Sequence, residues 1–378
     1  MTKKKIVGLF VGLSIILLII LCVVLSPFKT KAAYHFSDFS GRPPIHQLGG
    51  ASAKPSGLTP AQIKSAYNLP ATGGHGTIAI IDAYDDTTIE KDLATFDKQF
   101  NLPACTIANG CLVIHLMGQT KRDSGWAQET ALDVEWAHAI APKAKILLVA
   151  AKTPSGANLL AAVDYAVKRS DVVAVSMSWG GEEFPDELSL DSHFKSATNK
   201  ITFFASAGDD GAGVSWPAVA PNVVAVGGTT LNFSANGQFK SETAWYGSGG
   251  GVSAYESEPA YQKAYNIPKA QGRRAIPDVA YDADPHSGLA VYSSNLNSNK
   301  GWYVFGGTSA GAPQWAAIKS LGLAADNNKF YLDKATKANG YFFRDIKSGS
   351  NGDCGYYCAA RSHYDYVTGL GSPLTVKF

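Results

Sequence analysis

Apolar runs alternate along this chain with segments whose apolar residues recur at helical spacing. Each run is a few residues long and rich in Val, Ile, Leu and Phe, which is typical of strands buried on both faces. The predicted strands are residues 78–82, 145–150, 172–175, 201–204 and 223–226, and the predicted helices include residues 127–140 and 159–167. This alternation predicts an α/β fold in which a mostly parallel central sheet carries helices on both faces.

A serine-containing turn follows a further extended run, residues 302–305, and leads into a predicted helix at 314–318. The turn reads GGTSAGAP over residues 306–313. A serine flanked by glycines between a strand and a helix can present its hydroxyl to a substrate, because the turn is sharp and the helix N-terminus favours negative charge. Ser309 is therefore a candidate nucleophile, although a Ser/Thr helix cap in a tight loop has the same pattern.

A nucleophilic serine needs a base, and the predicted helix 127–140 offers two acids. Glu129 and Asp133 are four residues apart, so both carboxyl groups project from one helix face. Either they form a solvated acidic face, or they share a proton, which raises the pKa of one of them. His75 lies in a glycine-rich turn before a strand and His138 points away from the acidic face, so neither is the preferred base.

A third acid follows the predicted strand 201–204. The chain there reads SAGDDG over residues 206–211, and subtilisin-like folds place an oxyanion-hole asparagine at such a strand end. The equivalent residue is Asp209. A carboxylate cannot donate a hydrogen bond to an oxyanion, whereas a protonated carboxyl group can. This residue therefore indicates a site that works in acid.

These segments together resemble the sedolisin family of serine-carboxyl peptidases, which has a subtilisin-like fold. The motifs ExxxD (129–133), SAGD (206–209) and GTSxxxP (307–313) occur in the family's order, and the resemblance extends from about residue 58 to the C-terminus. It implies the following roles: Ser309 as nucleophile, Glu129 as general base, Asp133 as its orienting partner, Asp209 as oxyanion donor, Ser178, Trp179 and Gly180 as lining of the substrate cleft, and Asp82 as an extension of the Glu129 network.

The resemblance also implies a calcium loop near the C-terminus. The carboxylates of Asp345 and Asp365 and the carbonyl of Ile346 are its expected ligands, and carboxylate and carbonyl oxygens suit Ca²⁺. Arg361 and His363 stand where the family usually has glycines, and their backbone carbonyls are the expected outer ligands. A C-terminal turn capped by the two aspartates is the alternative.

Composition limits the remaining function classes. The chain has 378 residues, of which 46% are hydrophobic and 17% charged, so it can build a large core. Its formal net charge of +2 gives no reason to expect a nucleic-acid partner. We expect protein or peptide substrates and a monomer.

The N-terminus predicts export. Residues 3–5 are lysines and precede an apolar run over residues 6–25, so residues 1–33 are predicted to be a signal peptide or a membrane anchor. Either outcome puts the catalytic part outside the cytoplasm, secreted or anchored. Residues 34–57 are predicted to form a short arm or linker in place of the family's long prosegment, and residues 58–378 a single catalytic domain.

Four cysteines outside the apolar run agree with export. They form two local groups, and pairing within each group gives the disulfides Cys105–Cys111 and Cys354–Cys358. A zinc site is the alternative, but the spacings fit it poorly.

The sequence thus predicts an exported, acid-active serine-carboxyl endopeptidase. Two other interpretations stay open. One is a neutral subtilisin-like peptidase with a histidine base, His75 or His138. The other is a catalytically silent subtilisin-like fold used for binding.

Overall fold

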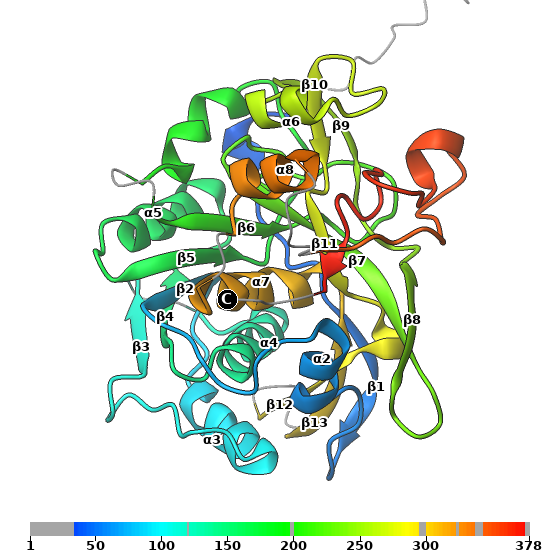
Figure 1. Cartoon of the computed structure of the whole chain (residues 1–378). Coiled ribbons are helices and arrows are strands. Elements are labelled where there is room, and N and C mark those ends of the chain that lie inside the picture. Colours follow the sequence, from blue (N-terminus) through cyan, green and yellow to red (C-terminus); the bar gives the residue numbers. More distant parts are fainter. Residues whose placement is uncertain are drawn as a thin grey trace, which may run out of the picture. The chain divides into compact units, whose positions relative to one another are not determined.

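A mostly parallel β-sheet forms the centre of the unit His35–Phe378 (Figure 1). The computed structural model describes residues 34–118, 121–196, 200–294, 300–322, 325–336 and 343–374. The order of the parallel strands is β11-β7-β6-β5-β2-β4-β3, and β8 pairs antiparallel with the end of β7. These strands are β2 (Thr77–Ala83), β3 (Leu112–Leu116), β4 (Lys145–Ala151), β5 (Val172–Met177), β6 (Thr202–Ser206), β7 (Val223–Phe233), β8 (Phe239–Ala244) and β11 (Val279–Asp282).

Smaller sheets flank this one. The segment β1 (His46–Ser52) pairs antiparallel with β13 (Gly301–Gly306), which also pairs with β12 (Leu289–Ser293). The strands β9 (Gly251–Ser257) and β10 (Arg273–Ile276) form a second antiparallel pair, and β14 (Phe343–Arg344) with β15 (Ser372–Pro373) a third. The strand β13 thus ends at Gly306, the first residue of the serine turn.

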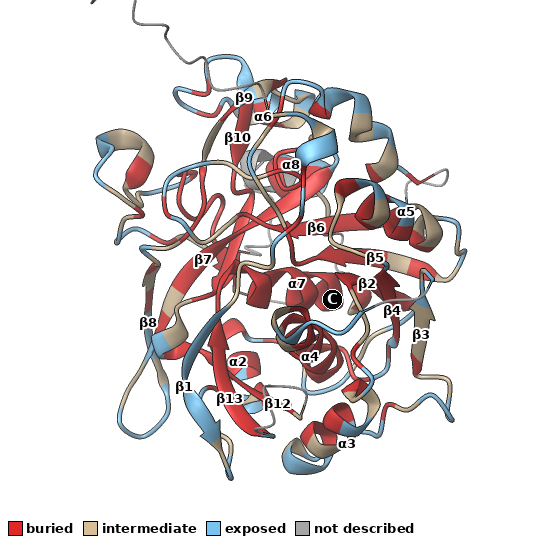
Figure 2. Cartoon of the chain, turned by 180° about the vertical axis from the view of Figure 1, so that it is seen from behind, coloured by how far each residue is buried: buried red, intermediate tan, exposed pale blue. Residues whose placement is uncertain are grey.

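Helices cover both faces of the central sheet. The helices α4 (Ser124–Ile140) and α7 (Gly311–Ser320) pack on one face, and α5 (Gly156–Val167) packs on the other (Figures 1 and 2). The remaining α-helices are α2 (Pro60–Tyr67), α3 (Ile89–Phe100), α6 (Ala260–Tyr265) and α8 (Asn327–Thr336). Short 3₁₀ turns are η1 (Phe36–Asp38), η2 (Glu187–Phe194), η3 (Pro285–Ser287), η4 (Thr308–Ala310) and η5 (Gly355–Cys358).

The helix α4 is unusual because almost its whole circumference is buried. Asp123 caps its first turn by accepting hydrogen bonds from the backbone N–H groups of Gly125 and Trp126, and the helix ends at Ile140, two residues before Pro142. It packs against β2 and β4 of the sheet and against the helices α3 and α7 (Figure 2). Polar side chains on α4 are consequently enclosed by protein, the acids Glu129 and Asp133 included.

The predicted fold class is confirmed: the central sheet is mostly parallel and covered on both faces. Because parallel strands end at the same edge of a sheet, Asp82 at the end of β2, Ser178 after β5 and the segment after β6 lie along one edge. The predicted signal peptide or anchor, residues 1–33, lies outside the described residues. Within the described part of the chain, no helix combines the length and the apolar character that a membrane span requires.

Candidate active site

The serine turn is built on a glycine that no other residue could replace. Gly307 has a φ of 110°, and a Cβ atom added there would lie 2.1 Å from the carbonyl oxygen of Pro44 and 2.5 Å from Asp209 Oδ2. The chain then turns through η4 into α7, with Pro313 in the first turn of the helix. This places Ser309 in a fully buried position where β13 meets α7.

Three buried carboxyl groups gather beside this turn. Glu129 and Asp133 lie on one face of α4, as predicted, and Asp82 lies at the end of β2. Thr130 donates to Asp82 Oδ2 at 3.0 Å, and Ser178 donates to Asp133 Oδ1 at 2.9 Å. We refer to Asp82, Glu129 and Asp133 as the acid cluster.

Burial raises the pKa of every member of the acid cluster, because the charged form loses its hydration. For Asp82 the pKa rises to about 7. For Glu129 and Asp133 it rises well above the ordinary range, first through burial and then through the repulsion between the three carboxylates. The cluster therefore holds protons under conditions in which exposed carboxyl groups are ionised.

Two neighbours oppose part of the rise in the pKa of Glu129. Contact with Asp133 lowers the pKa of Glu129 and raises that of Asp133, so a single proton shared by the pair is favoured on Asp133. The Ser309 hydroxyl also lowers the pKa of Glu129. The Glu129 oxygens and Ser309 Oγ nevertheless have no hydrogen-bond partner of good geometry among the described residues, so the serine and the acid are adjacent but not yet hydrogen-bonded.

Asp209 lies on the other side of the serine turn. Its Oδ1 accepts from the backbone N–H of Thr308 at 2.8 Å and from the Thr308 hydroxyl at 2.7 Å, which leaves Oδ2 as the atom able to carry a proton. Burial raises the pKa of this carboxyl, against the opposing effect of His46, whose Nε2 lies 3.1 Å from Oδ2. The same contact raises the pKa of His46.

The segment predicted to line the substrate cleft adjoins the acid cluster. Ser178 contacts Asp133, and its hydroxyl lies 3.4 Å from the carbonyl oxygen of Ser309. Trp179 is fully buried and donates from its indole nitrogen to the Ile81 carbonyl. Gly180 pairs its backbone with Arg42, a residue of the N-terminal arm.

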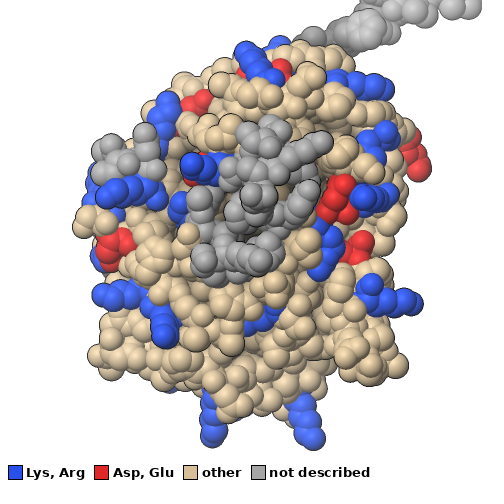
Figure 3. Space-filling view, in the orientation of Figure 1, with Lys and Arg blue, Asp and Glu red and all other residues tan. Residues whose placement is uncertain are grey.

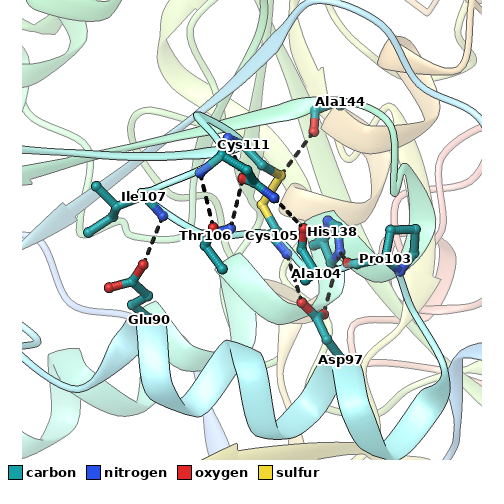
Figure 4. The surroundings of a disulfide bond; sticks show 11 residues. Glu90, Asp97, Pro103, Ala104, Cys105, Thr106, Ile107, Cys111, His138 and Ala144 are labelled. Atoms are coloured by element: carbon teal, nitrogen blue, oxygen red, sulfur yellow. Dashed lines mark hydrogen bonds and ion pairs between the residues drawn. A yellow bond between two sulfur atoms is a disulfide. The ribbon is translucent and has the colours of Figure 1, made fainter.

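The two histidines considered as alternative bases are engaged elsewhere. The backbone of His75 hydrogen-bonds Ser320 near the end of α7. His138 is buried, with Nε2 2.8 Å from the Pro103 carbonyl and 3.4 Å from Asp97 Oδ1 (Figure 4). Burial lowers its pKa. Among the recorded contacts of the described residues, neither imidazole touches Ser309.

Both predicted disulfides are present. Cys105 bonds Cys111 in the loop before β3 (Figure 4), and Cys354 bonds Cys358 around η5. His138 lies close enough to Cys105 and Cys111 for the three to resemble a metal site. Because the two sulfur atoms are bonded to each other, they are not thiolate ligands, and the predicted disulfide accounts for this pair.

The predicted calcium loop brings its two aspartates to one segment. Asp345 Oδ2 accepts from the backbone N–H of His363 at 3.1 Å, and Asp365 Oδ2 accepts from that of Arg361 at 3.1 Å. His363 has a φ of 69°, the left-handed conformation that glycine adopts most easily. Both aspartates thus accept hydrogen bonds from the backbone of residues 361–363.

Only part of the donor set of this loop is free to bind a hard cation, because Asp365 Oδ1 already accepts from the backbone N–H groups of Val367 and Thr368 at 2.9 and 2.8 Å, as a turn cap does. Asp345 Oδ1 is buried without a hydrogen-bond partner among the described residues, and a carboxylate oxygen left in that state favours a bound cation. The guanidinium of Arg361 stacks over the Tyr356 ring at 4.0 Å, where cation–π attraction holds it. Ile346, the predicted carbonyl ligand, is buried directly after Asp345.

Several site residues were not foreseen from the sequence. Thr308 holds Asp209, Thr130 holds Asp82, and His46 with Pro44 approaches the serine turn from the arm. Thr308 precedes Ser309 and Thr130 follows Glu129, so their closeness to predicted site residues in the sequence could have indicated a role. The arm residues are more than 250 positions from Ser309, and nothing in their local pattern indicates the contact.

Comparison with known proteins decides the family. The sequence model of the subtilase family matches residues 112–339 of this chain. The chain belongs to the subtilase family. Within it, kumamolisin from Bacillus sp. (strain MN-32) is 32% identical over 86% of this chain, and sedolisin from Pseudomonas sp. (strain 101) is 33% identical over 53% of it. The predicted membership of the sedolisin family is thereby confirmed.

A solved structure agrees with the sequence relatives. Pseudomonas sedolisin, a serine-carboxyl proteinase complexed with two molecules of pseudo-iodotyrostatin, superposes with a TM-score of 0.70 at 26% identity. The match covers 85% of this chain and 96% of that one. The chain spans 64% of the length of kumamolisin and 39% of that of full-length sedolisin, less than two thirds of either relative.

Proposed function

We propose that this sedolisin-family chain is an acid-active serine-carboxyl peptidase. The observation that carries the proposal is the position of Ser309 between two acids, Glu129 on one side and Asp209 on the other, both buried and both with raised pKa values. A buried serine flanked by protonatable acids, with no imidazole in recorded contact with it among the described residues, suits nucleophilic attack under acidic conditions. The relatives named as proteinases and peptidases support the same conclusion.

The reaction begins with attack of Ser309 Oγ on the carbonyl carbon of the scissile peptide bond. Glu129 accepts the hydroxyl proton as the new C–O bond forms, while Asp133 shares its own proton with Glu129 and orients it. The C–N bond then breaks as Glu129 returns the proton to the leaving amine. Water attacks the acyl-enzyme in the same way and regenerates the serine.

Asp209 stabilises the oxyanion of the tetrahedral intermediate. Its Oδ1 is engaged by two donors from Thr308, so the proton belongs on Oδ2, which faces the serine turn. The backbone N–H of Ser309 is the second donor at this place. The role requires a protonated carboxyl group, and burial raises the pKa of Asp209 in the direction that this requires.

Activity therefore depends on two acids in different protonation states. Glu129 must be ionised to accept the serine proton, and Asp209 must be protonated to donate. As the pH rises, Asp209 loses its proton and the oxyanion loses a donor, so the rate falls toward neutrality.

Calcium and export complete the proposal. Asp345, Asp365 and the carbonyls of Ile346, Arg361 and His363 are the residues that would hold Ca²⁺, which when bound would cross-link the C-terminal loop. Disulfides form in oxidising compartments, so the two in this chain support secretion, or anchoring with the catalytic domain outside the cytoplasm.

The substrates are proteins or peptides, and the working form is a monomer. On the face drawn in Figure 3, lysine and arginine side chains are spread among acidic ones rather than gathered into one patch. A dispersed charge of this kind does not favour a nucleic-acid partner.

The test is to trap the acyl-enzyme. The full chain is incubated at about pH 4 with a peptide ester and quenched in acid, and the intact mass is measured. We expect a mass increase located on Ser309, no increase in Ser309→Ala, and cleavage of a denatured protein substrate over the same acid range. A chain that hydrolyses peptides without forming the adduct, or that forms it on another residue, contradicts the assignment.

A further inference from the structure

A second group of acidic side chains lies where η2 packs against β9, outside the acid cluster. Its members are Glu183, Glu187, Asp191 and Glu256, and we refer to their contact as the η2–β9 junction. Glu187 is fully buried and Glu256 is 2% exposed. Glutamates are almost never buried to this extent unless they are paired. The proposed mechanism gives these four residues no part in the reaction.

Hydrogen bonds attach the η2 segment, residues 181–194, to β9. Glu183 Oε2 accepts from the backbone N–H of Ala254 at 3.1 Å, and Glu183 Oε1 accepts from the hydroxyl of Ser253. The Ser253 hydroxyl also accepts from the backbone N–H of Glu256 at 2.7 Å. The attachment therefore depends on carboxyl oxygens of the η2 segment and on the backbone of β9.

Other oxygens of the junction have no donor to meet them. Glu187 Oε2 accepts from the backbone N–H of Phe184 at 3.0 Å. Glu187 Oε1, Glu256 Oε1 and Asp191 Oδ1 are buried without a hydrogen-bond partner among the described residues. The side chains of Glu187 and Glu183 contact each other. Two carboxyl groups can form a hydrogen bond only if one of them carries a proton, so the junction is satisfied in its protonated form.

The positive charges near the junction do not neutralise it. Arg274 on β10 lowers the pKa of Glu256, but its guanidinium already makes a bidentate ion pair with Asp278. Lys195 lowers the pKa of Asp191, and its side chain is exposed. Repulsion between the acids is therefore only partly offset when they ionise.

The acids of the junction hold their protons more tightly than exposed acids do. Burial raises the pKa of Asp191 to about 6, and burial with repulsion by neighbouring acids raises that of Glu256 to about 7 and that of Glu187 to about 9. Tyr261 on α6 also faces Asp191, and burial raises its pKa, so it stays neutral. Because the folded-state values are raised, the stability that these protons supply is present in acid and is lost as the pH rises through them.

The η2 segment continues directly from the predicted lining of the substrate cleft. Gly181 follows the predicted cleft residue Gly180 and exchanges both backbone hydrogen bonds with Trp216, each at 3.0 Å. The ring of Phe184 lies 5.3 Å from that of Trp216, and the ring of Phe194, at the end of η2, lies 5.9 Å from it. A change at the η2–β9 junction therefore acts on the packing next to the cleft.

We propose that the η2–β9 junction is a pH-sensitive switch, which holds the η2 segment against β9 in acid and releases it as the pH rises toward neutrality. The switch is separate from the reacting groups, because none of its acids contacts Ser309 among the recorded contacts of the described residues. Its consequence for peptide cleavage rests on the proposed function. The release itself can be measured in a chain that cannot cleave.

Hydrogen–deuterium exchange of the full Ser309→Ala chain at about pH 5 and about pH 8 tests the switch. The backbone N–H groups of Phe184, Ala254 and Glu256 donate hydrogen bonds within the junction, so their exchange reports its release directly. Protection is measured in peptides that cover residues 181–194 and 251–257, after correction for the effect of pH on intrinsic exchange. We expect protection in both to fall by about tenfold or more at the higher pH, because Asp191 and Glu256 ionise between the two values.

Variants that cannot ionise supply the comparison. Glu187→Gln and Glu256→Gln, each made in the Ser309→Ala chain, nearly preserve the size of the side chain and its capacity for hydrogen bonds. We expect the double variant to be as protected at the higher pH as at the lower, and each single variant to show a smaller fall than its parent. Glu182→Gln is the matched control, since Glu182 is exposed beside the junction, and it should keep the full fall.

The outcomes separate this proposal from the proposed function. Equal protection at the two pH values in Ser309→Ala, or a fall in the double variant as large as in its parent, overturns the switch and leaves the peptidase intact. A fall spread equally over β4 and β5 indicates global unfolding and also overturns the switch. The expected exchange pattern, in a chain whose Ser309 parent cleaves no peptide at any pH, sustains the switch and overturns the peptidase. Thermal unfolding identifies a variant that has failed to fold, in which case the remaining single variant decides.

Discussion

Arg274 and Asp278 form a buried ion pair, whereas the acid cluster of Asp82, Glu129 and Asp133 is buried without a cation among the described residues. The Arg274–Asp278 pair is bidentate, and Asp278 also accepts from Ala225 N–H and the Tyr331 hydroxyl. In the acid cluster, both Glu129 oxygens and one oxygen of each aspartate lack hydrogen-bond partners of good geometry among the described residues.

The difference separates a structural charge from a reactive one. Where every oxygen of a buried carboxylate is satisfied, removing the group leaves several buried partners unpaired, so its role is structural. Where the oxygens are left open and the pKa is raised, the group is poised to move a proton. The comparison therefore predicts opposite consequences for substitutions that look alike.

The largest expected effect is on catalysis. Ser309→Ala and Glu129→Gln should each lower kcat/KM on the order of 10⁴-fold or more, because each removes a member of a unit that acts together. Both are measured in the full chain, against the wild type under the same conditions. Asp278→Asn, assayed under conditions where it is folded, is the control and should keep most of the activity. A Glu129→Gln chain as active as its parent would remove Glu129 from the mechanism.

The second effect is on stability. Here Asp278→Asn should be the more damaging substitution and Glu129→Gln the milder one. Asp278→Asn should lower the free energy of unfolding by about 3–5 kcal/mol, because it leaves Arg274 buried without its countercharge. Glu129→Gln should leave the stability at pH 7 unchanged or raise it, because it replaces an unsatisfied acid with a neutral amide. Denaturant unfolding followed by tryptophan fluorescence measures both. Comparable losses of unfolding free energy in the two variants would show that the Arg274–Asp278 pair and the acid cluster do not differ in this way.

The pH dependence of stability tests the acid cluster as a whole. Its pKa values are raised in the folded state, to about 7 for Asp82, so between about pH 4 and 7 the folded chain keeps protons that the unfolded chain releases. Stability from these groups is thus greatest in acid and is lost as the pH rises. We expect a loss of a few kcal/mol over this range, at about 1.4 kcal/mol per pKa unit, and a smaller loss in Asp82→Asn. A free energy of unfolding that rises toward neutrality in the wild type but not in Asp82→Asn would contradict the conclusion that burial raises these pKa values.

Asp209 should give a smaller and more selective effect. Asp209→Asn keeps a donor but loses the shape of the proton-bearing acid, so we expect about a tenfold to hundredfold loss at acid pH. Because an amide does not ionise in this range, the fall of activity toward neutrality should become shallower. The pH–rate profile of kcat measures this, with Asp210→Asn as the neighbouring control. If the pH–rate profile of Asp209→Asn fell toward neutrality as steeply as that of the wild type, the fall would have to come from the ionisation of another group.

The smallest effect concerns the C-terminal loop. A calcium chelator should lower the Tm by a few degrees, since an ion bound only by the folded state stabilises it. Asp345→Asn should have a lower Tm from the start and respond little to the chelator. A wild-type Tm that is indifferent to both chelator and added Ca²⁺ would leave the aspartates as turn caps.

The sequence was sufficient for those features that depend on neighbouring residues. The alternation of apolar runs and helical segments predicts the sheet, and the four-residue spacing of Glu129 and Asp133 predicts their shared face because a helix repeats at that interval. Each disulfide joins cysteines only 6 or 4 residues apart, so their pairing could also be predicted from neighbouring residues. The motif order of the resemblance then supplied roles that spacing alone left open.

The features that the sequence did not predict depend on long-range packing. Nothing around Pro44 or His46 indicates that they meet Ser309 and Asp209, since the contact arises only when β1 pairs with β13. Residues 34–57 are predicted to be a linker because they carry Pro43-Pro44 and Gly49-Gly50 and show no strand or helix pattern. The burial of Phe39 in this segment depends on Trp179, Phe184 and Trp216, which come from separate segments between β5 and β7.

The most direct measurement of the central claim is the pH–rate profile of kcat/KM from about pH 3 to 8, on a quenched fluorescent peptide, in the full wild-type chain. A serine activated by Glu129 and assisted by protonated Asp209 predicts a maximum in acid and a steep fall toward neutrality, with no profile left in Glu129→Gln. A maximum above pH 7 that survives Glu129→Gln would contradict the account, because a carboxyl pair would then not be the base.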